Sequence, residues 1–331
     1  MAQHVGVLGT GSYAPARVVS NAEVAGPAGV TSDWITVRTQ IRSRRYAAPD
    51  EATSDLAVRA AAQALANAGL TADEVDFLVL ATSTPDHPQP PTSYLVQHAL
   101  GATGAVCLDI NVVCSGFVYG LEVARSLLAT RPGGHALVVG ADIYSRIVDP
   151  ADRASVVLFG DGAGAVVVGP CPEAVGIIGT ELRSNGSEHD LVGVHAGGSR
   201  APASVGTLDA GLHYFRMRGR DVRRFVTDHV PPILSDLLRV HGTMTSEIDH
   251  FVPHQANGVM LDDLAKTVGL AGAQTHRTIE QYGNTGSASI PLTLDQANRD
   301  GRFKRGDLVL LAGFGGGMSL GACLLRWCAG Q

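Results

Sequence analysis

Charged residues are scarce in this 331-residue chain: Asp, Glu, Lys and Arg make up 17% of it, whereas apolar residues make up 45%. Disordered proteins have the opposite balance, so we expect a chain that buries a large core. Basic residues are in the minority, with 25 Lys and Arg against 31 Asp and Glu and a net charge of −6. This charge gives no reason to bind nucleic acid, and we expect no such partner.

Cysteine pairs of the C-x-x-C type are absent, and the five cysteines leave one over in any pairing scheme. This argues against a disulfide framework or a zinc knuckle and favours a reducing cytoplasm. The first sixteen residues lack the Lys or Arg of a secretory signal. The charge-free segment 308–325 contains five glycines, which is typical of strand, turn and strand rather than a membrane helix. We therefore expect a cytoplasmic protein with no membrane partner.

Short apolar runs typical of buried strands alternate with Ala- and Leu-rich helical stretches, which is the pattern of an α/β protein. Apolar spacing predicts a helix over 54–68 that ends at Gly69. The helical stretch 217–241 contains Pro231-Pro232, which we expect to break it into two pieces. A further helix is expected over 288–298. The predicted strands cover 77–81, 106–112, 135–140, 156–159 and 163–168.

Two segments of the first half recur in the same order in the second half. Residues 74–79 (EVDFLV) resemble 247–252 (EIDHFV), and 159–165 (FGDGAGA) resemble 314–320 (FGGGMSL). We therefore expect a duplicated α/β unit with its junction near residue 170. The predicted domains are 1–170 and 171–331, and the segment 184–211, rich in Gly, Ser, Ala and His, is expected to be a long loop or cap.

Two motifs suggest cofactor or metal chemistry that their surroundings do not support. Gly9-x-Gly11-x-x-Ala14 has the spacing of a dinucleotide fingerprint, but Pro15 interrupts the helix that should open there. His250 and His254 are spaced like helical metal ligands, but Pro253 lies between them in a strand-like pattern. We therefore expect neither a nicotinamide cofactor nor a metal site.

Cys114 lies where the apolar run 106–113 ends and a helical pattern begins. At such a joint the N–H groups and dipole of the helix lower the pKa of a thiol from about 8.5, which favours a nucleophile. Small residues, Ser115 and Gly116, leave room for a thioester to approach. The alternative interpretation is a buried core cysteine, and the local sequence leaves the two evenly balanced.

Polar groups of the second half could act together with this thiol. His254 directly follows a strand pattern, where open α/β sheets place their sites, and Asn284 lies in a turn bracketed by glycines. The segment 313–317 (GFGGG) could aim backbone N–H groups at an oxygen. Each signal alone is weak, because loop histidines are usually solvated and asparagines between glycines are usually turn residues.

In kind and in order, these motifs resemble those of β-ketoacyl-acyl carrier protein synthase III. The resemblance implies the thiolase fold, in which two duplicated α/β halves form a five-layer α-β-α-β-α sandwich. It also implies a homodimeric acyltransferase. The shared segments are N-V-V-C-S-G-F at 111–117, H-Q-A-N at 254–257, Y-G-N-T-G-S at 282–287, W-I-T-V-R-T at 34–39, D-P-A-D-R at 149–153, F-G-D-G-A-G-A at 159–165 and G-F-G-G-G at 313–317.

The resemblance implies a condensation that needs no cofactor and uses coenzyme A thioesters as substrates. Cys114 would accept the acyl group of an acyl-CoA primer, with the backbone N–H groups of Cys114 and Gly316 as oxyanion hole. His254 and Asn284 would bind the thioester carbonyl of malonyl-acyl carrier protein, or malonyl-CoA, while it loses CO₂. The product would initiate fatty-acid or polyketide synthesis. The residues implied to hold coenzyme A are Trp34, Arg38, Arg153 and Asn257.

Two departures from the family pattern concern its partners. The family commonly has a basic residue two places after H-Q-A-N that docks the carrier protein, where this chain has Gly258-Val259. Arg223, Arg224 and Lys266 are the alternative docking candidates. Where the fatty-acid enzyme has an aromatic residue that reaches across the dimer into the acyl pocket, this chain has Gln89. We expect an altered primer pocket and hypothesise a role in polyketide or other specialised synthesis.

Other functions are compatible with parts of the pattern. A related enzyme could transfer the acyl group to a hydroxyl or amine without decarboxylation, and the sequence leaves this open. A degradative thiolase needs a second reactive cysteine and a histidine at position 284, and neither feature is evident. A hydroxymethylglutaryl-CoA synthase needs a glutamate upstream of Cys114, which is also not evident. The local cysteine signature of a papain-like hydrolase is absent from this sequence. A non-enzymatic scaffold would leave Cys114 unreactive.

Overall fold

Two five-stranded sheets with the same strand order form the framework of the molecule. The computed structural model describes residues 4–329. Its first sheet has the order β1 (Val5–Tyr13), β7 (Asp161–Pro170), β6 (Ala136–Ile143), β4 (Phe77–Ala81) and β5 (Val106–Ile110). The second has the order β8 (Gly176–Ser184), β14 (Ser319–Arg326), β13 (Leu308–Gly315), β11 (His250–Pro253) and β12 (Gln274–Thr275).

The two sheets also share their strand directions. In each sheet the first two neighbouring pairs are antiparallel and the last two are parallel. The strands of the first sheet come from residues 5–170 and those of the second from residues 176–326. This repetition confirms the predicted duplication.

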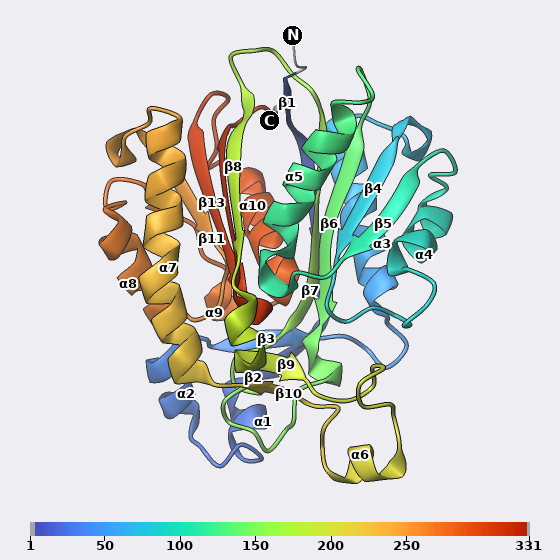
Figure 1. The fold of residues 1–331 in the computed structure, drawn as a ribbon, viewed down its shortest axis with the longest axis vertical. Coiled ribbons are helices and arrows are strands. Elements are labelled where there is room, and N and C mark those ends of the chain that lie inside the picture. Colours follow the sequence, from blue (N-terminus) through green and yellow to red (C-terminus); the bar gives the residue numbers. More distant parts are fainter. Residues whose placement is uncertain (1–3, 330–331) are drawn as a thin grey trace.

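Helices separate and cover the sheets. The helices α5 (Gly116–Leu128) and α10 (Ser289–Arg299) lie between them (Figure 1). The outer face of the first sheet carries α3 (Thr53–Ala68) and α4 (Thr92–Leu100). The outer face of the second carries α7 (Gly219–Val240) and α8 (Gly258–Val268). The layers therefore follow the order α-β-α-β-α, as predicted for the thiolase fold.

The central layer is apolar because each of its two helices lies between the two sheets and packs against both. Phe117 and Leu121 of α5 and Ile290 and Leu294 of α10 are buried in one cluster with residues of both sheets. The buried carboxylate of Asp295 on α10 accepts hydrogen bonds from hydroxyl groups of β1. The first turn of α5 approaches the turn that precedes α10. The two central helices thus begin at the same end of the sandwich.

A cap of short elements covers that end. It contains β2 (Arg17–Ser20), α1 (Asn21–Ala25), α2 (Ser32–Thr39) and β3 (Ser43–Tyr46) from the first half (Figure 1). The segment predicted as a loop or cap, 184–211, contributes η4 (Gly186–Leu191), β9 (Val192–Val194) and α6 (Val205–Asp209), and β9 pairs with β10 (Phe215–Met217). No helix within residues 4–329 has both the length and the apolar character needed to span a membrane.

Two local predictions are wrong, for reasons that lie in tertiary packing. Residues 156–158 form hydrogen-bonded turns and Phe159 forms only an isolated bridge with Asn284, because these apolar side chains pack beneath the cap and not in a sheet. The helix α7 continues through Pro231-Pro232. The prolines remove two N–H donors, but a buried apolar face of α7, including Phe225 and Leu234, packs against the second sheet on both sides of them.

Candidate active site

Cys114 lies in the short 3₁₀ helix η2 (Val113–Ser115), between β5 and the first turn of α5. Its side chain is buried, and the Ser115 hydroxyl fixes the segment by donating to the carbonyl of Ser319 at 2.9 Å. Val113 adopts a left-handed φ of 47°, a strained conformation for a β-branched residue. Gly315 must be a glycine here, because a Cβ would lie 2.7 Å from the backbone nitrogen of Cys114.

His254 directly follows β11, as the sequence predicts, and its backbone N–H donates to Ala312 of β13 at 2.7 Å. Its imidazole Nδ1 lies 2.6 Å from the hydroxyl oxygen of Ser289, the first residue of α10. The ring meets Phe314 edge-on, with 5.2 Å between ring centroids. Burial lowers the pKa of His254 to about 3, so the imidazole is neutral at physiological pH.

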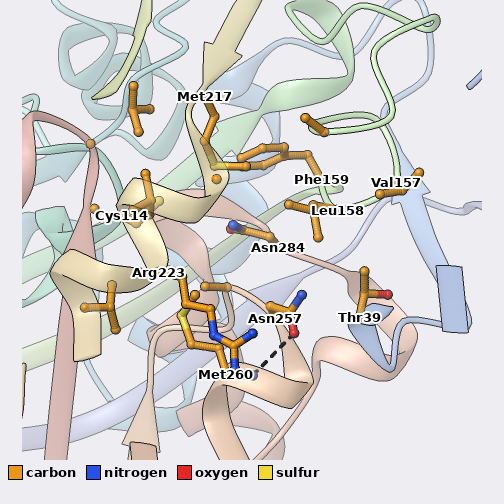
Figure 2. Close-up of a pocket in the computed structure, with 18 of the residues that line it drawn as sticks. Thr39, Cys114, Val157, Leu158, Phe159, Met217, Arg223, Asn257, Met260 and Asn284 are labelled. Atoms are coloured by element: carbon orange, nitrogen blue, oxygen red, sulfur yellow. Dashed lines mark hydrogen bonds between the residues drawn. The ribbon is translucent and has the colours of Figure 1, made fainter. Parts of the chain in front are cut away.

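Asn284 is held in place by both its backbone and its side chain. The backbone N–H donates to the Leu158 carbonyl at 2.8 Å, and the Asn284 carbonyl accepts from Gly160 at 3.0 Å. The side-chain oxygen accepts from the Gly286 N–H at 2.9 Å. Figure 2 shows the side-chain nitrogen of Asn284 pointing towards the part of the cavity that holds Cys114. This amide is therefore oriented as a hydrogen-bond donor.

One cavity of about 700 Å³ joins the residues that the sequence singles out. Its inner wall includes Cys114, His254, Asn284 and Gly316, which lies at the turn between β13 and β14. Apolar side chains of the cap, among them Phe215 and Met217, complete the wall. The predicted coenzyme A contacts also line this cavity, namely Trp34, Arg38, Arg153 and Asn257.

The outer part of the cavity is basic. Arg38, Arg153 and Arg220 line it with exposed side chains, and none of the three forms a salt bridge with another residue of the 4–329 range. Unpaired guanidinium groups suit phosphate oxygens. Sequence reasoning missed Arg220, because nothing in its local sequence shows that the first turn of α7 faces the cavity.

Asn257 has a structural role in addition to its place in the cavity wall. Its side-chain oxygen caps α8 by accepting from the N–H groups of Val259 at 2.9 Å and Met260 at 3.3 Å (Figure 2). Its side-chain nitrogen donates to the Arg38 carbonyl at 3.1 Å. Both polar ends therefore already have partners within the chain, and a contact with the pantetheine arm stays a prediction.

The structure does not bring the other predicted binding residues into this wall, with the exception of Arg223. Arg223 lines the cavity but pairs with Asp263 at 2.7 Å, and Arg224 pairs with Asp221 at 3.0 Å. Lys266 is exposed on α8. Gln89 is exposed in a separate hollow beside His87 and Asn111, away from the thiol of its own chain. Arg224, Lys266 and Gln89 therefore do not line the cavity of Cys114 within one chain.

The electrostatic prediction for Cys114 is wrong. Burial is the largest effect on the thiol and raises its pKa, and the nearby Asp142 carboxylate raises it further. The hydroxyl of Tyr144, another residue of the cavity wall, lowers the pKa of this thiol. The position at a helix N-terminus is as predicted, but the exclusion of water outweighs it. Sequence reasoning also missed Asp142 and Tyr144, which lie about thirty residues beyond Cys114 in the chain.

No metal site is formed by the residues that the structure describes, since no three His, Cys, Asp or Glu side chains in them are grouped to hold an ion. His250 is instead buried in a hydrogen-bonded chain. Its Nε2 lies 2.9 Å from Asp307, and its Nδ1 lies 3.0 Å from Nε2 of His276. Both ring nitrogens of His250 therefore lie beside Asp307 and His276 rather than beside His254.

Comparisons with known proteins agree with this architecture. Residues 108–186 match the family model described as 3-oxoacyl-[acyl-carrier-protein (ACP)] synthase III, and residues 238–327 match the model of its C-terminal part. The chain is 55% identical over 323 residues to acetoacetyl CoA synthase NphT7 of Streptomyces sp. (strain CL190), covering 97% of this chain and 98% of that protein.

Two further relatives are similar over nearly their whole length. The chain is 42% identical to β-ketoacyl-[acyl-carrier-protein] synthase III of Symbiobacterium thermophilum, covering 98% of both chains. The crystal structure of 3-oxoacyl-[acyl-carrier-protein] synthase III from Aquifex aeolicus VF5 superposes with a TM-score of 0.90 at 36% identity, covering 98% of this chain and 100% of that one. The chain therefore belongs to the 3-oxoacyl-[acyl-carrier-protein] synthase III family of condensing enzymes.

Proposed function

We propose that this enzyme loads an acyl group from an acyl-CoA onto Cys114 and condenses it with a malonyl thioester, with loss of CO₂. One observation carries the proposal: a buried thiol, a neutral imidazole and an oriented amide line one cavity whose outer part carries unpaired arginines. A thiol is both a good nucleophile and a good leaving group, which a covalent acyl carrier needs.

In the loading step, the Cys114 sulfur attacks the thioester carbonyl of the primer. The neutral His254 accepts the thiol proton and returns it to the departing coenzyme A thiolate, so that Cys114 thiol and acyl-CoA become acyl-Cys114 and coenzyme A. The backbone N–H groups of Cys114 and Gly316 would stabilise the oxyanion formed on the way. The oxyanion role is supported by the position of both residues in the cavity wall.

In the condensation step, His254 and Asn284 would donate hydrogen bonds to the carbonyl oxygen of the malonyl thioester. Loss of CO₂ places negative charge on this oxygen, so the donors bind the enolate more strongly than the substrate. The enolate carbon then attacks acyl-Cys114 and releases a β-ketoacyl thioester. Ser289 supports both roles of His254, because a hydroxyl can accept from Nδ1–H or donate to unprotonated Nδ1.

We propose that the extender is malonyl-CoA in preference to malonyl-acyl carrier protein. The basic residue that commonly docks the carrier is absent after H-Q-A-N, and Arg223 and Arg224 already pair with aspartates. Arg38, Arg153 and Arg220 are available for the phosphates of coenzyme A. The name of the Streptomyces relative, acetoacetyl CoA synthase, supports a product that leaves on coenzyme A. The two extenders are distinguished by their kcat/KM values in one assay.

We further propose a homodimer in which Gln89 of each subunit approaches the acyl cavity of the other. The support is the family resemblance and the exposure of Gln89 outside its own cavity. Light scattering after size exclusion measures the dimer. In Gln89→Phe the larger side chain should shift primer preference towards shorter acyl groups, and an unchanged preference would exclude Gln89 from the pocket.

Intact mass spectrometry after incubation with acyl-CoAs of increasing length tests the loading step. We expect a mass increase of one acyl group that disappears in Cys114→Ala and persists in Cys323→Ala, a control in the buried core. Adding malonyl-CoA should then release a ketone-bearing product and CO₂ together. Free acid would instead indicate a hydrolase, and an ester or amide formed without CO₂ would indicate simple acyl transfer.

A further inference from the structure

A buried carboxylate that the mechanism above does not use joins the two halves of the molecule next to Asn284. Asp142 lies near the end of β6 and is fully buried. One of its oxygens accepts from the backbone N–H of Ser83 in the first half at 2.8 Å. The other oxygen accepts from the backbone N–H of Ser287 in the second half at 2.7 Å. Since Ser287 follows Asn284 by three residues, Asp142 links the loop after β4 to the turn that carries this amide.

Ser287 is held against the first half by its side chain and its carbonyl as well. The Ser287 hydroxyl lies 2.8 Å both from the Asp142 carboxylate and from the carbonyl oxygen of Ala81, the last residue of β4. Gly140 of β6 must be a glycine, because a Cβ there would lie 2.4 Å from the Ser287 carbonyl oxygen. The turn after Asn284 is therefore closely packed on the ends of β4 and β6.

Gly286 connects this anchor to the side chain of Asn284. Its backbone N–H donates to the side-chain oxygen of Asn284 at 2.9 Å, and the amide nitrogen points towards the part of the cavity that holds Cys114 (Figure 2). Gly286 has a φ of 60°, and a Cβ there would lie 2.3 Å from a carboxylate oxygen of Asp142 and 2.5 Å from a ring carbon of Tyr144. The backbone that orients the amide thus lies directly against the carboxylate.

The donors around Asp142 require an acceptor at both of its oxygens. Hydroxyls can rotate to accept a hydrogen bond, as those of Thr82 and Thr84 could, but the backbone N–H groups of Ser83 and Ser287 cannot. A side chain without both acceptors would leave at least one of these buried N–H groups unpaired, which is unfavourable. The carboxylate therefore fixes the spacing between the two segments that carry the N–H groups.

The carboxylate does not assist the loading step. Its negative charge raises the pKa of the Cys114 thiol and so opposes ionisation of the nucleophile. Its hydrogen bonds reach the turn of Asn284 instead, whose amide has its proposed role only after the acyl group is on the sulfur. The contacts of Asp142 therefore associate it with condensation rather than with loading.

We propose that Asp142 is a positioning residue for condensation, which holds the Asn284 amide at the cavity by accepting from backbone N–H groups of both halves at once. The inference rests on the proposed function of Asn284. Asp142 is not part of the cavity wall, so it acts through the amide and not on the substrate. Without it, the amide would donate poorly to the enolate oxygen, whereas acyl-Cys114 would still form. A misplacement of about 1 Å is enough to lower a rate by about 10²-fold.

Asp142→Ala in the full chain removes both acceptors. We expect kcat for release of labelled CO₂ from malonyl-CoA to fall by about 10–10²-fold, with a smaller change in KM, because the amide binds the enolate more strongly than the substrate. Acyl loading from acetyl-CoA, measured by intact mass, should stay close to wild type. Added to Asn284→Ala, the same change should cause no further loss of decarboxylation. Asp295→Ala is the matched control, since this buried carboxylate also joins α10 to the first sheet, through hydroxyls of β1.

The outcomes separate this inference from the proposed function. If Asn284→Ala keeps wild-type decarboxylation, the proposed function of Asn284 fails. If Asn284→Ala loses decarboxylation but Asp142→Ala keeps it, only the role of Asp142 is overturned. Equal losses of loading and decarboxylation in Asp142→Ala, or a further loss in the double variant, would also overturn it, because a merely structural carboxylate predicts them. Should Asp142→Ala fail to fold, Ser287→Ala should lower decarboxylation by about three-fold and keep loading; unchanged decarboxylation there would contradict the proposal equally.

Discussion

The two halves of the molecule have the same sheet but different residues at the same edge of it. In the first half, the strand β5 leads through Cys114 into the central helix α5; in the second, the corresponding segment leads through Asn284 into α10. After β4 the chain continues with Thr82 and Ser83, whereas after the corresponding β11 it continues with His254. In the proposed mechanism, one half supplies the nucleophile and the other supplies the hydrogen-bond donors for condensation.

In both halves, burial favours the uncharged form of the reacting group. It raises the pKa of Cys114 and lowers that of His254 to about 3, so it favours the uncharged form of each group. A thiolate–imidazolium pair is therefore not the resting state, and the thiol proton must leave during the reaction. The comparison teaches that a duplicated frame can produce an asymmetric site when the residues at the strand ends differ.

The largest effect should come from the second half. His254→Ala removes a donor to the enolate, and we expect malonyl decarboxylation to fall by about 10²–10³-fold. Release of labelled CO₂ from malonyl-CoA measures this step. Retention of wild-type decarboxylation would show that the second half does not supply the donors. The matched control is His189→Gln on the surface of the cap.

Gly315→Ala tests how tightly the halves close on each other. The new methyl group would lie 2.7 Å from the Cys114 backbone nitrogen and 3.0 Å from its Cβ, so the two loops must separate. We expect a loss of about 1–3 kcal/mol in the free energy of unfolding, together with slower acyl loading. Denaturant unfolding and intact mass report the two effects. Gly104→Ala, where a Cβ meets no atom within 4 Å, should change neither; equal effects in both variants would show that the halves are not in close contact.

The neutral state of His254 predicts a pH dependence of stability. Its pKa is about 3 in the folded protein, below the ordinary value of 6.5, so between these values the unfolded chain binds more protons. Stability from this group is therefore complete above pH 6.5 and falls as the pH decreases towards 3. From pH 6.5 to 5.0 the loss should be about 2 kcal/mol, and His254→Gln should remove that part. An equally steep loss in His254→Gln would contradict burial of the neutral imidazole.

The smallest effect concerns the basic part of the cavity, to which the first half contributes Arg38 and Arg153. Arg38→Ala and Arg153→Ala should each raise KM for acyl-CoA by roughly five-fold, since exposed charge contacts contribute little. The increase should shrink at high salt, because screening weakens the contact in the wild type as well. Arg239→Ala, far along α7 and paired with Asp236, is the control. No change with either cavity arginine would place the coenzyme A phosphates elsewhere.

The sequence predicts the regular parts of the fold and the residues that share local motifs. The strand Phe77–Ala81 and the helix ending at Gly69 follow from apolar spacing and a left-handed glycine, with φ of 69° in the structure. The continuity of α7 through Pro231-Pro232 could not be predicted, because it depends on burial against the second sheet. The turn at 156–158 depends in the same way on packing beneath the cap.

Within the site, the sequence indicated Cys114, His254 and Asn284 because each occurs in a recognisable segment. It did not indicate Ser83, Asp142 or Tyr144, which occur in no such segment and meet only when β4 and β6 pair. Nor did it indicate the direction of the Cys114 pKa shift. Local sequence shows the helix terminus beside the thiol, whereas the exclusion of water results from both halves and the cap, which together form the cavity wall around it.

The division of labour between the halves is tested most directly by two variants in two assays. Acyl-enzyme mass and CO₂ release from malonyl-CoA should be measured side by side for Cys114→Ala and Asn284→Ala. We predict a crossed result: Cys114→Ala forms no acyl-enzyme but still decarboxylates malonyl-CoA, whereas Asn284→Ala forms the acyl-enzyme and loses decarboxylation. Full decarboxylation by Asn284→Ala, or an acyl-enzyme in Cys114→Ala, would contradict it.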